Sequence, residues 1–195
     1  MNKIIYKTIK FILKPIFKIL YRPTVIGKEN IPKDGGVILC GNHTSNLDCA
    51  FMILIPDRIV HTLSKKELFD SKIGNLFFKS MGCISVNRKE HDKNAVNEAI
   101  EVLNNKDVIG IFPEGTINKT NNIILPFKYG AVSFAKKTNA QIVPFCITGK
   151  YKLFKKSITI EYAKPYKVTK DLEEENKKLE NIIKEMLIKR RKINE

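Results

Sequence analysis

Residues 37–48, VILCGNHTSNLD, predict a strand, a turn and the start of a helix in direct succession. The apolar run Val37–Cys40 has the composition of a buried strand, and Gly41 allows the chain to turn after it. The next segment, Ser45–Asp48, has the S-x-x-D pattern of a capping box and precedes the apolar run Cys49–Ile55, which predicts a helix. A strand that leads straight into a helix is typical of an α/β domain.

The rest of the chain repeats this alternation of strand and helix patterns. We therefore expect one α/β domain over residues 23–195, with a central mixed, mostly parallel sheet flanked by helices, preceded by a separate amphipathic segment over residues 1–22. The expected strands are Val37–Cys40, Ile59–Leu63, Cys83–Val86, Val108–Phe112, Gln141–Ile147 and Ser157–Tyr162, and the expected helices cover residues 48–55, 93–104, 130–137 and 171–191.

The charge balance of the chain indicates a polyanionic partner. The sequence has 195 residues, enough for one domain with a core, and carries a formal net charge of +15. Such an excess suits either nucleic acid or an anionic membrane surface. The sequence contains no zinc-finger spacing, no aromatic RNA-binding motif and no arginine-rich arm. We therefore expect the membrane as partner, with nucleic-acid binding as the alternative of another class.

The cysteine pattern indicates buried thiols in a reducing compartment. Each of the four cysteines stands singly in an apolar run, without a CxxC pair. Neither the cysteines nor the three histidines have the spacing of metal ligands, so we expect no metal site and a protein that is not secreted. The cysteines are Cys40, Cys49, Cys83 and Cys146.

Residues 1–22 predict an amphipathic helix with one cationic face. Its lysines recur every three or four positions and fall within an arc of about 80°, with isoleucines and leucines opposite. Pro15 is expected to kink or divide this helix. Uncharged apolar runs are too short for a membrane span or a signal peptide, so we expect the segment to lie in a membrane surface. The alternative is that it covers the protein's own core. The lysines are Lys3, Lys7, Lys10, Lys14 and Lys18.

His43 and Asp48 are the strongest candidates for chemistry. Five positions on an ideal helix turn through about 500°, so the two side chains would not share a helix face. They meet if His43 lies in the loop after the strand and Asp48 in the first turn of the helix. Asp48 would then keep one ring nitrogen of His43 protonated and leave the other as a general base. The alternative is that Asp48 only caps the helix and His43 is an ordinary loop residue.

Four segments in a fixed order resemble the glycerophospholipid acyltransferase family, and most closely its 1-acylglycerol-3-phosphate acyltransferases. They are NHTSNLD at 42–48, SKKELF at 64–69 with MGCISVNR at 81–88, FPEGT at 112–116, and FKYGA at 127–131 followed by IVP at 142–144. The similarity covers roughly residues 24–165. Order and spacing agree in all four segments.

The resemblance implies direct transfer of a fatty acyl group from acyl-coenzyme A or an acyl carrier protein to the hydroxyl of 1-acylglycerol 3-phosphate, which gives phosphatidate. It implies that His43 removes the hydroxyl proton and that Asp48 orients His43. No covalent acyl-enzyme is implied, so Ser45 is expected to cap the helix rather than to attack. No cofactor is expected, and the enzyme is expected at the cytoplasmic face of the cell membrane as a peripheral or monotopic protein.

The same resemblance assigns the phosphorylated acceptor to the FPEGT segment and Arg88. Arginine binds phosphate oxygens with two parallel hydrogen bonds, and a glycine allows close approach of the backbone. Glu114 either accepts from an acceptor hydroxyl or braces its loop, and the alternative for Arg88 is a solvated surface charge. The expected substrate-binding residues are Arg88, Phe112, Pro113, Glu114, Gly115, Thr116, Lys119 and Lys128.

Two positions depart from the family pattern. Asn87 stands where an acidic residue usually precedes the arginine, and Ile117 stands where an arginine usually follows the threonine. Lys119 and Lys128 are candidates to replace the missing cation. A different lysolipid or hydroxyl acceptor is therefore the alternative to 1-acylglycerol 3-phosphate.

Overall fold

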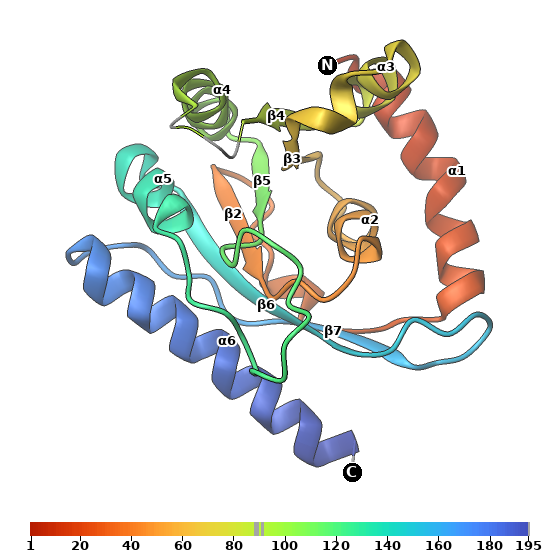
Figure 1. Ribbon diagram of the computed structural model, residues 1–195, viewed down its shortest axis with the longest axis vertical. Coiled ribbons are helices and arrows are strands. Elements are labelled where there is room, and N and C mark those ends of the chain that lie inside the picture. The colour runs from red at the N-terminus through yellow and green to blue at the C-terminus, as the bar shows by residue number, and fades with distance from the viewer. Residues whose placement is uncertain (88–89, 91, 195) are drawn as a thin grey trace.

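A seven-stranded sheet forms the centre of the computed structural model, which describes residues 1–87, 90 and 92–194 (Figure 1). The strand order is β1-β7-β6-β2-β5-β3-β4; β6 and β7 are antiparallel, and the other neighbours are parallel. This arrangement confirms the expected mixed, mostly parallel α/β sheet. The strands are β1 (Thr24–Ile26), β2 (Val37–Gly41), β3 (Val60–Lys65), β4 (Ile84–Val86), β5 (Val108–Ile111), β6 (Gln141–Gly149) and β7 (Ile158–Tyr162).

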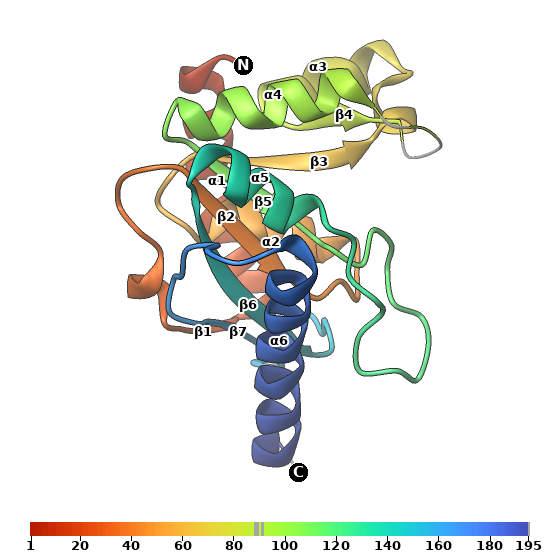
Figure 2. The ribbon, with the colours of Figure 1, turned by 90° about the vertical axis from the view of Figure 1, so that its left-hand side faces the viewer.

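Helices cover both faces of the sheet (Figures 1 and 2). Three helices, α4 (Lys93–Asn104), α5 (Gly130–Thr138) and α6 (Leu172–Asn194), pack on one face. On the other face lie α1 (Lys3–Tyr21) and α2 (Leu47–Leu54). The helix α3 (Lys72–Ser80) packs beside α1, and short 3₁₀ turns occur at Lys28–Asn30 and Lys66–Phe69.

The central strand β2 is buried along its whole length. Successive strand residues point to opposite faces, so Val37 and Leu39 pack toward α2 while Ile38 and Cys40 pack toward α4, α5 and α6. Because both faces are covered, the strand is a continuous apolar run rather than an alternating one. This pattern explains why the segment could be recognised from its sequence.

The register of β2 determines where the site lies. Leu39 pairs with Gly110 of β5 and with Val143 of β6, so β2 has a parallel neighbour on each side. The carboxyl ends of β2 and β5 therefore meet at the same edge of the sheet. In open parallel sheets this edge is where ligands bind.

One of the two effects expected of Pro15 does not occur, and two elements were not predicted. The helix α1 continues through Pro15, so the proline does not divide it; side chains before and after the proline, Tyr6 and Phe17, pack against the body of the protein and hold both halves in place. The strand β1 and the helix α3 were not predicted. β1 has only three residues, and α3 contains a glycine and exposes much of its apolar surface, so neither has a clear pattern.

Candidate active site

The structure brings His43 and Asp48 together at the end of β2. His43 lies in the loop after the strand, Asp48 lies in the first turn of α2, and His43 Nδ1 is 3.0 Å from Asp48 Oδ2. A carboxylate oxygen only accepts, so Nδ1 donates this hydrogen bond. The Nε2 atom of the ring then carries the free lone pair. This is the arrangement expected of an oriented general base.

The Asp48 carboxylate is fully buried and is held by four donors. Its Oδ2 atom accepts from the backbone N–H groups of Thr44 at 2.6 Å and Ser45 at 2.7 Å as well as from His43. Its Oδ1 atom accepts from the hydroxyl of Tyr151. The bond from Ser45 N–H is one half of a capping box, so Asp48 caps the helix and also holds His43.

The Ser45 hydroxyl is used locally. Its Oγ atom accepts from the backbone N–H of Leu47 at 3.2 Å, within the turn that begins α2. This contact agrees with a capping role for Ser45. It differs from the full capping box, in which the hydroxyl would accept from the N–H of Asp48.

The His43 ring is fixed by stacking as well as by hydrogen bonding. It lies parallel to the Phe112 ring, with centroids 4.1 Å apart and an interplanar angle of 8°. The His43 side chain is 12% exposed, so the stacked ring retains access to the cavity described below. Phe112 follows β5 directly, which places it next to the end of β2.

Glu114 braces the histidine loop. Its Oε1 atom accepts from the backbone N–H of His43 at 2.8 Å, and its Oε2 atom accepts from the backbone N–H of Leu125 at 2.8 Å. The side chain is only 5% exposed, and this burial raises the pKa of Glu114 even though the two N–H donors act in the opposite direction. Of the two roles considered for Glu114, the contacts favour bracing.

The turn at Gly115 lies against the side chain of Lys128. Gly115 has a φ of +71°, and a Cβ atom added there would lie 2.9 Å from Cε of Lys128. The backbone N–H of Lys128 also donates to the carbonyl of Pro113 at 2.9 Å. The Lys128 side chain therefore lies against a position that only glycine fits without strain.

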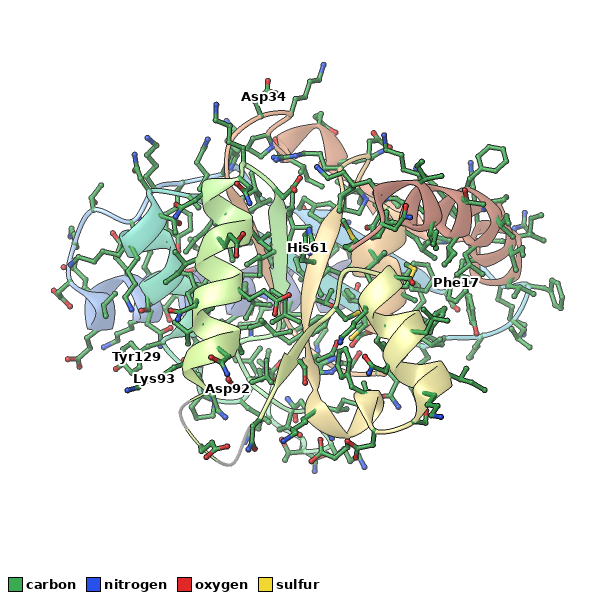
Figure 3. All side chains as sticks on the ribbon, turned by 90° about the horizontal axis from the view of Figure 1, so that it is seen from above. Phe17, Asp34, His61, Asp92, Lys93 and Tyr129 are labelled. Atoms are coloured by element: carbon green, nitrogen blue, oxygen red, sulfur yellow. The ribbon has the colours of Figure 1, made fainter. Side chains whose placement is uncertain are left out.

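A cavity of about 460 Å³ adjoins His43. Its polar part includes His43, Asn87 and Lys128, and Asp92 and Tyr129 lie at neighbouring helix starts on its border (Figure 3). Its apolar part is formed mainly by side chains from β3, β4, β5, α4 and α5, namely Leu63, Val86, Ala95, Val96, Ile111 and Phe134. The cavity thus has a mainly apolar lining that suits a hydrocarbon chain, with polar side chains of both charges, including the carboxylates of Glu90 and Asp92 and the cation of Lys128.

Only some of the predicted substrate-binding residues line this cavity. Phe112, Pro113, Gly115 and Lys128 line the cavity together with His43. Thr116 and Lys119 are exposed and are not among its lining residues. The position of Arg88 lies outside the described residues.

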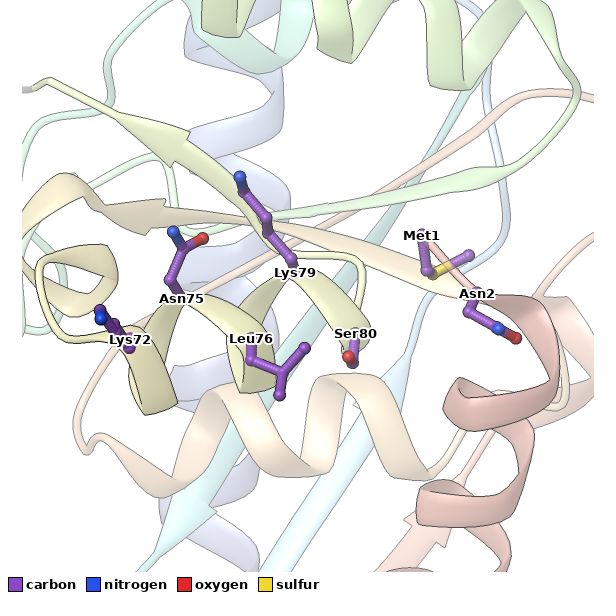
Figure 4. A pocket seen from close by; sticks show the side chains of 7 residues that line it. All are labelled: Met1, Asn2, Lys72, Asn75, Leu76, Lys79 and Ser80. Carbon is purple, nitrogen blue, oxygen red and sulfur yellow. The ribbon is translucent and has the colours of Figure 1, made fainter.

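A second hollow of about 410 Å³ lies between the start of α1 and the helix α3 (Figure 4). None of the sequence-predicted site residues lines it. Its border consists of Met1, Asn2, Lys72, Asn75, Leu76, Lys79 and Ser80. The cavity beside His43 is therefore the candidate active site.

Two supporting residues extend the predicted site. Asn42 is buried and exchanges hydrogen bonds with the backbone of Ile147, at 2.8 and 3.0 Å, which joins the start of the histidine loop to β6. Tyr151 reaches Asp48 from 103 positions away, and no local sequence pattern indicates such a contact. Across residues 1–87, 90 and 92–194, no group of three or more His, Cys, Asp or Glu side chains could hold a metal ion.

Comparisons with known proteins show which family this chain resembles in sequence and fold. A family model described as Acyltransferase matches residues 22–148. The 1-acyl-sn-glycerol-3-phosphate acyltransferase of Bacillus subtilis is 31% identical over 145 residues, covering 74% of this chain and 71% of the relative. The protein of the same name from Borreliella burgdorferi is 33% identical over 176 residues, covering 85% and 70%. The crystal structure of the 1-acyl-sn-glycerophosphate acyltransferase PlsC from Thermotoga maritima matches with a TM-score of 0.76 and 25% identity, covering 95% of this chain and 79% of the other.

Proposed function

The chain belongs to the acyltransferase family, and on that premise we propose that it acylates the free hydroxyl of 1-acylglycerol 3-phosphate to give phosphatidate. The observation that carries the proposal is the His43–Asp48 pair: the Nε2 atom of His43 is not used in that hydrogen bond, and the ring lines a mostly apolar cavity that also has polar side chains. The relatives from Bacillus subtilis and Borreliella burgdorferi are named for this reaction. The acyl donor is a thioester, either acyl-coenzyme A or an acyl carrier protein.

The site geometry supports a single direct transfer. His43 Nε2 accepts the proton of the acceptor hydroxyl while the hydroxyl oxygen attacks the thioester carbonyl carbon. The new C–O bond forms, the C–S bond breaks, and the thiolate that leaves takes the proton from His43. Asp48 keeps Nδ1 protonated and stabilises the transient imidazolium. No cofactor enters this sequence, and the Ser45 hydroxyl is already used in the turn.

Lys128 is the residue best placed to bind the acceptor phosphate. It lines the same cavity as His43 and lies against Gly115, so an anion bound there would be close to the general base. The apolar part of the cavity suits a fatty acyl chain. Because Ile117 replaces the cation usual in this family, a different lysolipid acceptor is the second candidate.

The outward face of α1 supports a membrane partner. Three of its lysines contact groups on the body of the protein: Lys10, which is buried, donates from Nζ to the carbonyl of Arg58 at 2.8 Å, while the more exposed Lys14 and Lys3 lie 3.2 Å from Asp57 and 3.9 Å from Asp107. The apolar side chains are left outside, with Phe11 at 82% exposure. An apolar helix face with nearby cations is typical of a helix that lies in a membrane surface. The exposed set on α1 is Ile4, Ile5, Phe11, Ile12, Ile16 and Ile19.

The helix α3 continues this apolar surface. It packs beside α1, and Ile73, Leu76 and Phe77 are exposed on it. None of the helices in the described part of the chain is both long and apolar enough to cross a bilayer. The placement at the cytoplasmic face of an anionic membrane rests on the cysteines, which have the single spacing typical of a reducing compartment. Cys40, Cys83 and Cys146 are buried as expected, whereas Cys49 is only half-buried.

The proposed reaction is tested by acyl transfer from radiolabelled long-chain acyl-coenzyme A, with an acyl carrier protein donor in parallel. The acceptors are 1-acylglycerol 3-phosphate, glycerol 3-phosphate and neutral lysolipids, each presented in anionic vesicles. We expect label in phosphatidate with the wild type and a loss of roughly 10²-fold or more in His43→Ala. Transfer only to another lysolipid would support the second candidate, and no transfer from either donor would contradict an acyltransferase.

A further inference from the structure

The loop between β6 and β7, Lys150–Ser157, carries an exposed apolar tip. Leu153 and Phe154 are 57% and 63% exposed, although both are large hydrophobic side chains. Phe154 has a φ of +59°, a backbone conformation that bulky residues rarely adopt. The backbone N–H of Phe154 donates to the carbonyl of Leu20 at 2.5 Å, so the tip is attached to the end of α1. The fold thus holds two apolar side chains in water at a defined place.

The same loop is strongly cationic. Four lysines, Lys150, Lys152, Lys155 and Lys156, surround the tip, and the loop contains no acidic residue. Lysines are attracted to an anionic lipid surface, and apolar side chains between them can enter the lipid. Figure 1 shows this loop at the carboxyl end of α1, on the side of the molecule that α1 covers. The loop therefore continues the proposed membrane-facing surface of α1 and α3.

We propose that the β6–β7 loop is a separate bilayer contact, in which Leu153 and Phe154 enter the lipid and the lysines bind anionic headgroups. The proposal deepens the proposed function, since it assumes that α1 lies on the same membrane. It adds a contact beyond the amino-terminal segment. It also extends the contact beyond the carboxyl end of α1, to which the loop tip is hydrogen-bonded.

The absence of tryptophan from the sequence gives a direct test. Phe154→Trp places one fluorophore on the loop, Phe11→Trp places one on α1, and Ile193→Trp, at a position 59% exposed on α6, serves as the control. Each variant is mixed with vesicles that contain phosphatidylglycerol and lipids brominated in the acyl chain. We expect a blue shift and at least twofold quenching at positions 154 and 11, with neither at position 193.

The outcomes separate the two proposals. Quenching at position 11 without quenching at position 154 overturns the loop contact and leaves the α1 contact intact. Quenching at neither position contradicts the membrane partner itself. Should the backbone at position 154 not tolerate tryptophan, Leu153→Trp gives the same reading at the neighbouring tip residue.

Tyr151, at the base of this loop, is the basis of a second inference. The Tyr151 hydroxyl donates to Asp48 Oδ1, while the other carboxylate oxygen faces His43. Its ring stacks on Phe51, with centroids 5.6 Å apart, and makes an edge contact with Tyr21. The ring is thus held in an aromatic cluster formed by α1, α2 and the loop, and the hydroxyl is directed at the buried carboxylate.

We infer that Tyr151 is a positioning residue for the acyl-transfer reaction. Its hydroxyl holds the Asp48 carboxylate so that Oδ2 stays directed at His43 Nδ1. Burial and the adjacent carboxylate raise the pKa of Tyr151, so the hydroxyl remains a donor throughout the working pH range. The titratable groups that surround it are Asp48, Cys49 and Tyr21, with His43 beyond the carboxylate.

The test compares Tyr151→Phe with Tyr21→Phe, which removes a hydroxyl from the same aromatic cluster. Loss of a hydrogen bond to a charged group is expected to lower kcat about tenfold in Tyr151→Phe, with KM unchanged. The freed carboxylate oxygen concentrates more negative charge beside His43, which stabilises the imidazolium. The acidic limb of the kcat/KM profile should therefore move to higher pH in Tyr151→Phe and stay in place in Tyr21→Phe.

A spectroscopic measurement tests the role of Tyr151 without assuming the proposed function. The chain has three histidines, so the ring ¹⁵N signals of His43 can be assigned by substitution and titrated without substrate. The ring ¹⁵N signals of His43 should change in Tyr151→Phe, and change in the opposite direction when 3-fluorotyrosine, a stronger donor, replaces Tyr151. Identical titrations in Tyr151→Phe, Tyr21→Phe and the wild type would overturn the inference, whatever the enzyme assay gives.

Discussion

The Glu114 carboxylate is bonded to the backbone N–H of His43, 71 positions earlier in the chain, at a distance of 2.8 Å. The contact joins the loop after β2 to the turn after β5. Since the second oxygen of Glu114 accepts from Leu125, one buried side chain organises three segments of the site. This links the two sequence motifs physically: one carries the general base, and the other holds it in place.

Replacing Glu114 should therefore damage both activity and stability. In Glu114→Gln an amide N–H₂ group would face one of the two backbone N–H donors, which leaves that donor without an acceptor. We expect kcat to fall roughly 10- to 100-fold and the free energy of unfolding to fall by about 1–3 kcal/mol. Urea unfolding and the acyl-transfer assay measure the two effects. Glu101→Gln, at an exposed position on α4, is the control, and equal behaviour of the two variants would contradict the bracing role.

Lys128 and Lys119 should differ sharply, although the sequence suggested both as acceptor ligands. Lys128 lines the cavity beside His43, whereas Lys119 is exposed and is not among the lining residues. Lys128→Met would remove a charge-assisted hydrogen bond to the phosphate. We therefore expect KM for the phosphorylated acceptor to increase about tenfold in this variant. Lys119→Met should keep the wild-type KM. Steady-state kinetics with varied acceptor concentration measure KM in both variants. A larger increase in KM for Lys119→Met than for Lys128→Met would show that the phosphate binds near Lys119 instead.

Local signals explain how much of the site could be predicted. The strand–turn–helix pattern of residues 37–55 placed His43 and Asp48 correctly because the turn residues and the helix start are adjacent in sequence. The contact of Tyr151 with Asp48 depends on how β6 and β7 pack against α1 and α2, and no local pattern records that packing. Glu114 was placed in the site, but its choice between two roles needed the distances to His43 and Leu125.

The strands, too, could be predicted only where their own sequence carries a clear pattern. β2, β5 and β6 are buried on both faces, so their apolar runs are visible in the sequence. β1 has three residues and pairs only with β7 at the sheet edge, so its stability comes from a distant partner. The lysines of α1 form one face as expected, yet Lys10 is buried against the protein while Phe11 is exposed. Periodicity identifies the faces of a helix but not which of them turns inward.

The buried Lys10 should make stability depend on pH in an unusual direction. Burial, together with the charge of Lys14, lowers the pKa of Lys10 to about 8 from its ordinary value of 10.5. Between these values the unfolded chain binds the proton and the folded protein does not. The free energy of unfolding contributed by this group therefore rises as pH increases from about 8 to 10.5 and is constant below that window.

Urea unfolding at pH 7.5 and pH 9.5 measures this effect in three proteins. Lys10→Met should lack the gain that the wild type shows between the two pH values. Lys7→Met, at an exposed position on the same helix, should follow the wild type. A wild type that gains no stability relative to Lys10→Met would mean that the Lys10 ammonium stays charged when the protein folds.

Ile117 directly follows the FPEGT segment, where the resemblance to the family leads us to expect an arginine. The residue after it, Asn118, donates its backbone N–H to the carbonyl of His43 at 2.8 Å, so Ile117 is held within one residue of the histidine loop. Its side chain is half-buried and lies in the same turn region as Gly115. A guanidinium introduced here would add a second cation to the region that Lys128 already serves. Ile117→Arg should therefore lower KM for 1-acylglycerol 3-phosphate by about three- to tenfold and leave kcat unchanged.

Matched substitutions separate charge from size at this position. Ile117→Met keeps an apolar side chain of similar volume and should retain the wild-type KM. KM for a neutral lysolipid should be the same in all three proteins, because an added cation gains nothing from an acceptor without phosphate. If Ile117→Arg leaves KM for the phosphorylated acceptor unchanged while Lys128→Met raises it, Lys128 alone binds the phosphate. If neither substitution changes that KM, the phosphate does not bind at this end of the cavity, and the natural acceptor is a lysolipid held by its other groups.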